Sequence, residues 1–325
     1  MRKVFLLTAF AALVLVTGCE WLDRMKDPSK TDGKGAIKPV DSKSAPELVG
    51  YLNRQSGYVN SVRFSDAYIE VYVGKDKERW TLNDSSLVCA KPRNFLLVGG
   101  RHAMSNIVNI GSNSQEFWMY SKFPDQMFVV CSHADFPTAG EKLPFPFDPD
   151  WALQALGMTE YPTNLNYTAE ANERQREIWL NFDATTPQGV PVKRVVVFAA
   201  EQATGTQPQV RRHLILDAAG KMIAAAEVRD VSTVQVGTDP QSRQPIYAQV
   251  PTRVALDWPQ QQFKMEMKLG KPKVNERLSE TETGKLFARP TFDGVKPTNL
   301  AQVKFDPSSF RGATPEGSTK PFGSK

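Results

Sequence analysis

The chain has 325 residues, of which 41% are hydrophobic and 23% are charged, and its formal net charge is +5. These proportions are typical of a globular protein and allow one large domain or two small ones. The charge is small and no dense Lys/Arg run carries interleaved aromatic residues, so no nucleic-acid partner is expected.

Residues 1–18 have the pattern of a bacterial lipoprotein signal peptide. Arg2 and Lys3 precede an apolar run from Val4 to Val16 that is too short for a comfortable membrane span. The segment Leu15 to Cys19 resembles a lipobox, which predicts lipidation of Cys19 as the new N-terminus. Several acyl chains, palmitate among them, would give this cysteine a stable hold on a membrane. The alternative is an ordinary signal peptide followed by an incidental cysteine.

The residue after Cys19 is Glu20 and not aspartate. By the enterobacterial sorting rule this predicts the outer membrane, with the protein on its periplasmic face. Loss of the leader also removes Arg2 and Lys3, which lowers the formal net charge from +5 to +3.

Residues 19–43 contain few apolar side chains and are expected to form a disordered tether. A helix is predicted from Ser44 to Gln55, because Ser44 can cap it and Glu47 lies three residues later. Gly57 is expected to end this helix.

Short apolar runs separated by turns then predict strands. The richest part is a meander from Ile107 to Cys131, whose runs are too continuous for a sheet with only one covered face. Strands before the internal helix are expected at Val62–Phe64, Ile69–Val73, Leu87–Cys89, Phe95–Val98, Ile107–Ile110, Glu116–Tyr120 and Met127–Cys131.

The segment after this meander predicts a short helix that covers the sheet. Asp148 is placed as N-cap, Pro149 as the first helical residue and Gly157 as the C-terminal stop. Apolar Trp151, Leu153 and Leu156 on such a helix are typical of a lid.

Strands resume after the lid, and the last of them alternates most regularly between apolar and polar residues. They are expected at Glu177–Leu180, Lys193–Phe198, Arg212–Leu216, Met222–Val231, Ala248–Trp258 and Gln262–Leu269. Residues 291–325 hold few large apolar residues and are expected to be a disordered tail.

About eleven strands and two helices predict a mainly β (α+β) domain over residues 44–290. We expect a single strongly curved antiparallel sheet, or half-open β-barrel, with a leading helix and a helical lid on the concave face.

Few residues have the chemistry of a catalytic or metal site. Cys89, Cys131, His102 and His133 could be drawn together around zinc, but the paired spacing of zinc ligands is missing. There is also no G-x-S-x-G nucleophile motif and no phosphate-binding loop. We therefore expect no enzyme activity, no metal and no cofactor.

Cys89 and Cys131 leave two alternatives open. An exported protein could oxidise them to a disulfide. Strands of a meander lie about 4.8 Å apart, and a disulfide needs Cα atoms within roughly 7 Å. Because several strands separate the two cysteines, two buried thiols are favoured unless the sheet curves strongly.

The order of these motifs resembles the LolA/LolB superfamily of periplasmic lipoprotein carriers, whose relatives include RseB and LppX. The matching features are the leading helix, a basic residue before proline at Lys91-Pro92, and Gly111 leading into the aromatic strand with Trp118 and Tyr120. A later strand, Pro251 to Trp258, and a closing segment from Val274 to Phe287 complete the resemblance, which spans roughly residues 45–290.

The resemblance implies a half-open barrel with an apolar cavity, a helical lid and no catalysis. It implies binding of lipids or of the acyl chains of lipoproteins, in outer-membrane lipid or lipoprotein trafficking. The alternative is an envelope scaffold or sensor that fills its own cavity and acts through protein partners. The chain departs from the soluble carrier at Lys91, which replaces an arginine that contacts the lid, and in its long C-terminal tail.

Candidate ligand-binding residues come from the meander and from the lid, with Lys91 as a candidate lid contact. The aromatic members have a second interpretation as plain core residues. The candidates are Ile110, Phe117, Trp118, Met119, Tyr120, Phe128, Val129, Trp151, Leu153 and Leu156.

The anchor can be tested by Cys19→Ala, because a lipobox without its cysteine cannot be lipidated. We expect the variant to leave the membrane fraction, or to keep its leader and run as a larger species. A variant with wild-type fractionation and wild-type size would show that Cys19 is not the anchor.

Overall fold

The computed structural model describes residues 43–102, 105–122, 126–139, 149–200 and 209–302. The signal peptide, Cys19, the tether as far as residue 42 and the predicted N-cap Asp148 lie outside these residues. None of the described helices has the length and apolar character needed to cross a membrane.

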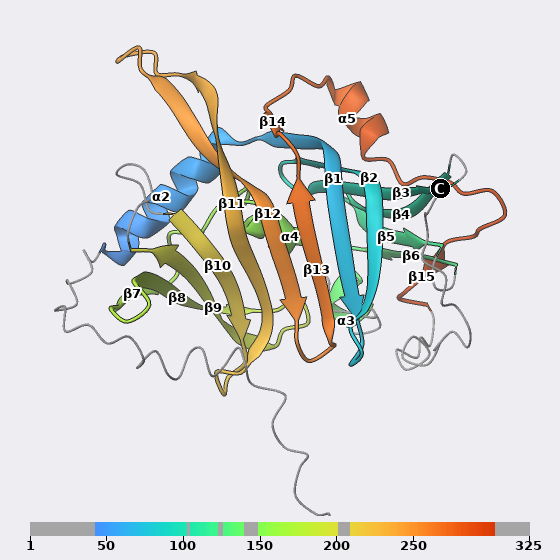
Figure 1. Cartoon of the computed structure of the whole chain (residues 1–325), viewed down its shortest axis with the longest axis horizontal. Coiled ribbons are helices and arrows are strands. Elements are labelled where there is room, and N and C mark those ends of the chain that lie inside the picture. The colour runs from blue at the N-terminus through green and yellow to red at the C-terminus, as the bar shows by residue number, and fades with distance from the viewer. Residues whose placement is uncertain (1–42, 103–104, 123–125, 140–148, 201–208, 303–325) are drawn as a thin grey trace, which may run out of the picture.

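The first half of the described chain is one helix followed by six strands (Figure 1). These are α2 (Ala45–Tyr58), β1 (Ser61–Val73), β2 (Glu78–Ala90), β3 (Asn94–His102), β4 (Ser105–Ser112), β5 (Glu116–Ser121) and β6 (Met127–Ser132).

Two short helices separate these strands from the second half of the chain. They are α3 (Phe136–Ala139) and α4 (Pro149–Ala155). The second half contains β7 (Tyr167–Asn172), β8 (Glu177–Thr185), β9 (Pro191–Ala199), β10 (Gln209–Leu216), β11 (Met222–Thr238), β12 (Pro245–Trp258), β13 (Phe263–Leu269), β14 (Lys273–Val274), α5 (Glu280–Leu286) and β15 (Thr298–Asn299).

All fifteen described strands belong to one sheet, in the order β15-β6-β5-β4-β3-β2-β1-β13-β12-β11-β10-β9-β8-β7, with β14 also paired to β1. Two meanders, β1–β6 and β7–β13, meet where β1 pairs antiparallel with β13. The sheet has two ends, β15 and β7, and is therefore not closed. The expectation of a wholly antiparallel sheet is wrong at one end, because β15 runs parallel to β6.

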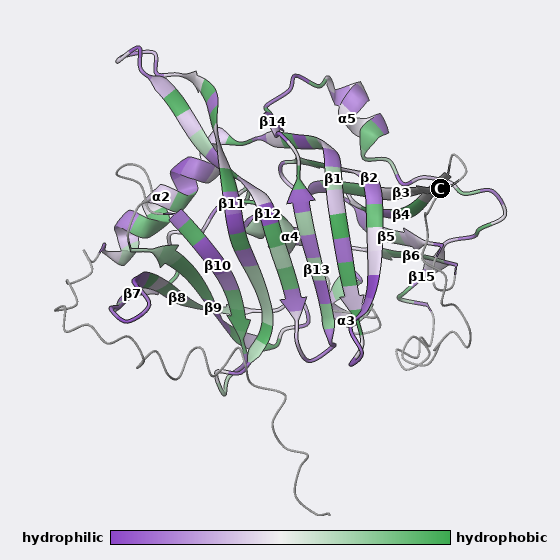
Figure 2. Ribbon diagram, viewed as in Figure 1, coloured by the Kyte–Doolittle hydropathy of each residue, from purple (hydrophilic) through white to green (hydrophobic). Residues whose placement is uncertain are grey.

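The strands alternate as their sequences predict, which Figure 2 shows as apolar and polar bands along β13 and β1. In β13, Met265 and Met267 are buried in the largest apolar cluster. Lys264 and Glu266 lie on the opposite, wetter face, where their side chains form an ion pair of 2.6 Å. One face of β13 therefore belongs to the interior and the other to solvent.

Helix α2 begins as predicted, with Glu47 accepting hydrogen bonds from the backbone and hydroxyl of Ser44 at 2.8 and 2.6 Å. It continues to Tyr58, one residue beyond the predicted stop at Gly57. Its buried face, including Leu48 and Leu52, packs on Leu180 and Phe198 of β8 and β9. The helix thus covers the β7–β9 end of the sheet.

Helix α4 lies behind the central strands in Figure 1, on the same side of the sheet as α3. The predicted helix is confirmed over Pro149–Ala155, and Gly157 follows it with a φ of 75°. A lid of the expected kind would bury one face. Instead, every side chain from Trp151 to Leu156 is buried, and Trp151 packs against Trp258 with ring centroids 5.5 Å apart.

The described part of the predicted tail, residues 291–302, is not disordered. Phe292 stacks on Tyr120 at a centroid distance of 3.7 Å, Leu300 is fully buried, and β15 extends the sheet. The composition of this segment predicted disorder, because large apolar residues are few in it. The three that it has, Phe292, Val295 and Leu300, nevertheless pack on the rest of the domain. The domain boundary expected at residue 290 is therefore wrong, and residues 303–325 lie outside the described chain.

Replacement of Leu300 tests whether this segment is part of the domain. Leu300→Ala should lower the free energy of unfolding by about 2–4 kcal/mol, since it empties a fully buried site. The matched control is Leu165→Ala, whose side chain is 36% exposed and whose loss should cost little. Equal denaturation midpoints for the two variants would show that the segment does not pack on the sheet.

Candidate functional site

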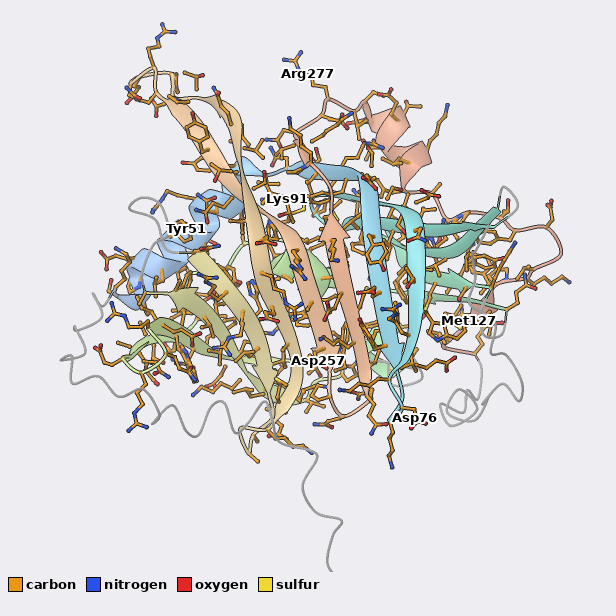
Figure 3. All side chains as sticks on the ribbon, viewed as in Figure 1. Tyr51, Asp76, Lys91, Met127, Asp257 and Arg277 are labelled. Carbon is orange, nitrogen blue, oxygen red and sulfur yellow. The ribbon has the colours of Figure 1, made fainter. Side chains whose placement is uncertain are left out.

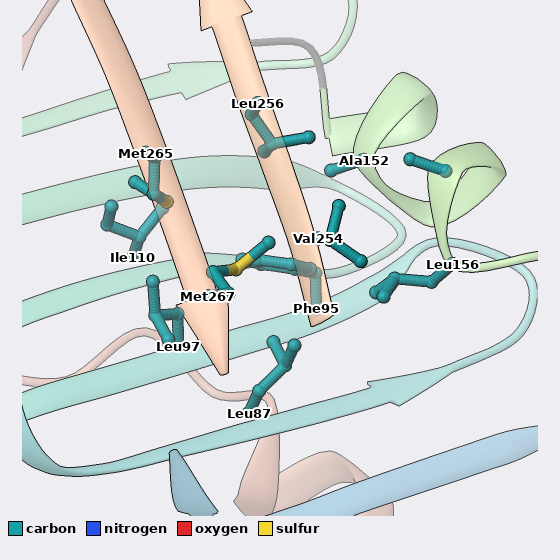
Figure 4. A pocket seen from close by; sticks show the side chains of 11 residues that line it. Leu87, Phe95, Leu97, Ile110, Ala152, Leu156, Val254, Leu256, Met265 and Met267 are labelled. Carbon is teal, nitrogen blue, oxygen red and sulfur yellow. The ribbon is translucent and has the colours of Figure 1, made fainter. Parts of the chain in front are cut away.

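The inner face of the sheet surrounds a small apolar cavity, shown in Figure 4. Strands β4 and β13 line it together although β3, β2 and β1 lie between them in the sheet, so the sheet bends around this point. The lining side chains from the described residues are all apolar: Leu87, Phe95, Leu97, Ile110, Val254, Leu256, Met265 and Met267 from the strands, Ala152 and Ala155 from α4, and Leu156 directly after it.

The cavity itself is almost full. Its volume is about 10 Å³, which is near the smallest space that holds one water molecule. Helix α4 and the residue after it provide much of the filling, because Ala152 and Leu156 point towards the lining strands in Figure 4 and Ala155 lines the same cavity. The strands thus form an apolar wall, and α4 fills the space beside it that a bound apolar ligand would need.

An ion pair links the start of α4 to the strands. Arg93 donates from Nε and Nη2 to the two carboxylate oxygens of Asp150 at 2.9 and 2.7 Å. The forked geometry is one that only arginine provides. Because the Arg93 and Asp150 side chains are 38% and 46% exposed, we expect this ion pair to stabilise the packing of α4 on the strands by only about 0.2–1 kcal/mol.

The predicted lid contact, Lys91, reaches a different place (Figure 3). Its Nζ donates to the carbonyl oxygen and hydroxyl of Ser56, near the C-terminal end of α2, at 2.8 and 3.0 Å. It also lies 4.0 Å from Glu160, beyond α4, and partial burial lowers its pKa below the ordinary value. Arg93, two residues further on, is the basic residue of this segment that contacts α4.

A second contact holds α4 from within. Arg194 of β9 donates from Nη1 to the side-chain oxygen of Gln154 at 2.9 Å. Gln154 is buried and belongs to the wall of a second cavity of about 50 Å³. Ala155 lines both cavities, so the two spaces flank the same helix.

This second cavity is partly polar. The hydroxyl of Tyr161 and Nδ1 of His213 lie 3.3 Å apart, and both side chains are buried. Asn53 of α2 fixes Tyr161 by bonding its backbone N–H and C=O at 2.7 and 2.9 Å. Burial and the Arg194 charge lower the pKa of His213 to about 4, so its ring is neutral at neutral pH.

The ten candidate ligand-binding residues fall on opposite faces of the sheet. Seven belong to the inner cluster, and two of these, Ile110 and Leu156, line the apolar cavity; the other five are Phe117, Met119, Val129, Trp151 and Leu153. The remaining three, Trp118, Tyr120 and Phe128, form a cluster on the other face with Phe292 and Val295. The period of two along β5 is the reason, since 117 and 119 point one way and 118 and 120 the other.

Trp118 has a structural role on that outer face. A Cβ on Gly111 would lie 2.1 Å from the Trp118 ring, so the ring covers the glycine directly. The indole N–H donates to the side-chain oxygen of Asn109 at 2.7 Å. Gly111 and Trp118 of the sequence motif therefore form a packing pair across β4 and β5.

The residues considered for zinc are dispersed. Within the described ranges, no three His, Cys, Asp or Glu side chains come together as a metal site. Cys89 and Cys131 are buried thiols and not a disulfide, and burial raises the pKa of Cys89. His133 instead contacts the carbonyl oxygen of Asn113 through Nε2 at 2.8 Å.

Sequence reasoning missed the polar contacts Arg93–Asp150 and Arg194–Gln154 and the Tyr161–His213 pair. In the sequence, Asp150 has only the position of a first-turn charge on its helix, which indicates no particular partner. No local pattern marks Arg194 or His213, because each sits in an ordinary strand and gains its partner from a distant part of the chain.

Comparison with known proteins finds solved structures of similar fold. No model of a protein family matches the sequence, and no curated protein matches it. A structure described as an outer-membrane lipoprotein-sorting protein domain from Vibrio parahaemolyticus is 10% identical with a TM-score of 0.48, and the match covers 74% of this chain and 98% of that one.

Two further structures are similar over a comparable length. A LolA superfamily protein from Nitrosomonas europaea is 9% identical, with a TM-score of 0.43, over 76% of this chain and 99% of that one. A DUF1329 family protein from Desulfovibrio piger is 10% identical, with a TM-score of 0.42, over 75% and 99%. At these identities and TM-scores the similarity concerns the fold alone.

The buried His213 predicts a pH dependence of stability. Its folded pKa of about 4 lies below the ordinary 6.5, so the unfolded chain takes up a proton first as the pH falls. The contribution of His213 to the free energy of unfolding should therefore be complete above pH 6.5. It should decline as the pH falls towards about 4, by up to roughly 3 kcal/mol. Denaturant titrations of the wild type and of His213→Gln should show a shallower decline in the variant, and identical declines would contradict the assignment.

Proposed function

We propose that this protein binds an acyl chain against the inner wall of its sheet, with α4 as the occupant that the chain replaces. The observation that carries the proposal is the wholly apolar lining contributed by β2, β3, β4, β12 and β13. In this proposal the sheet is a half-open barrel, and α4 closes it as a plug, more deeply inserted than a lid.

Energetics make such an exchange possible. Moving an acyl chain from water to an apolar wall gains about 0.8 kcal/mol per methylene. Moving it from a bilayer gains almost nothing, because the chain is already dry there. An acyl chain from a bilayer therefore does not by itself offset the exposure of Trp151 and Leu153 of α4, so the exchange requires that the displaced helix finds another apolar surface, such as the membrane. Under that condition, contacts such as Arg93–Asp150 can set its direction.

The proposed location follows from the N-terminal sequence. Lipidated Cys19 would anchor the protein at the periplasmic face of the outer membrane, and residues 19–43 would connect the domain to that membrane. The partners would be lipids or the acyl chains of lipoproteins, and the role would be in their trafficking. Non-enzymatic binding is consistent with the apolar lining, which offers no reactive group.

One observation favours a second candidate function. With about 10 Å³ of free space and α4 buried on all sides, the interior is filled by the protein's own side chains. A permanently filled interior would suit an envelope scaffold or sensor that acts through protein partners. The two candidate functions differ in whether α4 ever leaves the inner wall of the sheet.

Ligand titration separates them. We expect the unlipidated Cys19→Ala chain to bind a fluorescent fatty acid saturably. Leu97→Trp should weaken this binding at least tenfold, because the indole occupies the wall where methylenes would lie. The matched control is Leu96→Trp on the same strand, whose side chain packs with the outer clusters and should leave binding unchanged.

Circular dichroism of each variant establishes that it folds. Absence of saturable binding by a folded wild type would contradict the carrier function and support the scaffold. Equal loss of binding in Leu96→Trp and Leu97→Trp would show that the inner wall is not the site.

A further inference from the structure

The second cavity contains hydrogen-bonding groups, in contrast to the apolar cavity beside it. Its described lining combines apolar residues such as Leu52, Val210 and Val228 with the polar side chains of Tyr51, Gln55, Gln154, Thr159, Tyr161, His213 and Gln249. Arg194 is not part of this lining, but its guanidinium lies next to it, since it bonds Gln154 and its charge lowers the pKa of His213. A positive charge therefore adjoins a partly polar cavity that shares Ala155 with the apolar one.

Position in the strands shows that Arg194 faces the interior. Val196 and Phe198, two and four residues further along β9, belong to the inner cluster beneath α2, whereas Val195 and Val197 belong to an outer cluster. A positive charge on the inner face is costly unless it meets an acceptor. In the closed structure that acceptor includes the amide oxygen of Gln154.

Gln154 is a neutral group in a position suited to an anion. Its amide oxygen accepts a hydrogen bond from Arg194. Withdrawal of α4 would take this amide away and leave buried donors to be satisfied by another acceptor. An anionic oxygen would meet that need better than the amide does, because charge-assisted hydrogen bonds are stronger.

We propose that the second cavity, which Tyr161 and His213 line and which Arg194 adjoins behind Gln154, receives the carboxylate of a long-chain fatty acid whose alkyl chain lies on the adjoining apolar wall. This inference rests on the proposed function and names its ligand class. The carboxylate takes the place of the Gln154 amide at Arg194, and the alkyl chain takes the place of Ala152, Ala155 and Leu156.

The dimensions suit this group. About 50 Å³ accommodates a few water molecules, and a carboxylate is of that size, whereas a phosphocholine head is much larger. The neutral ring of His213 and the hydroxyl of Tyr161 add hydrogen-bonding partners without a competing negative charge. Ala155 lies in both linings, so its removal with α4 would join the two spaces.

The test compares cis-parinaric acid with its methyl ester on the unlipidated Cys19→Ala chain. We expect the acid to bind about tenfold more tightly, which is the effect of one charge-assisted hydrogen bond. Arg194→Met should bring the two affinities to the same value, and Tyr161→Phe should reduce the preference about threefold. The matched control is Lys193→Met, which removes a positive charge from the neighbouring exposed position and should keep the full preference.

The outcomes separate the two proposals. Equal affinity of the wild type for acid and ester would overturn the headgroup site while leaving acyl-chain binding in place. Binding of neither probe would overturn the proposed function itself. A preference for the acid that survives in a folded Arg194→Met chain, or is lost in Lys193→Met, would also overturn the site. Because the acid–ester comparison is first made on the wild-type cavity, it does not depend on the folding of any variant.

Discussion

The inner wall of an open, bent sheet must be kept dry, and much of this structure follows from that requirement. Alternation along β13, with Met265 and Met267 facing inward, creates the apolar surface. A closed barrel could fill such an interior with its own strands alone. Here the sheet ends at β7 and β15, so helices must complete the cover.

Each covering element is placed by a different kind of contact. Helix α2 is set by the Ser44–Glu47 capping pair and by apolar packing on β8 and β9. Helix α4 is set by burial on all sides, with Arg93 and Arg194 bonding it at two points. On the outer face, Phe292 covers Tyr120 and Phe128, so the end of the domain protects the aromatic strands from solvent.

Local patterns in the sequence were enough for β1–β6, β8–β13, the capped first helix and α4, because each depends on residues close in the chain, whereas β7, β14, β15, α3 and α5 were not predicted. The face of each aromatic residue in β5 was also fixed by the period of two, yet Phe117 and Trp118 were grouped together as ligand-binding candidates. Residues 291–302 were placed in a tail because composition averages over positions, whereas Phe292 and Leu300 act singly.

The polar contacts of α4 could not be predicted in the same way. The Arg93–Asp150 and Arg194–Gln154 bonds join residues 57 and 40 positions apart, and nothing in either local sequence requires its partner. The basic residue of the motif illustrates the difficulty. Lys91, the expected lid contact, bonds Ser56, while Arg93 makes the forked contact with Asp150. The polar contacts that hold α4 are therefore visible only in the three-dimensional structure.

Displacement of α4 by an acyl chain is the central claim, and hydrogen–deuterium exchange of the unlipidated chain, with and without saturating fatty acid, measures it most directly. The account predicts that the backbone amides of residues 150–155 in α4 exchange faster when the ligand is bound, while amides of β3 and β13 become better protected. Undiminished protection of α4 in the ligand-saturated protein would contradict it, because the chain would then be bound elsewhere or the interior would remain filled by α4.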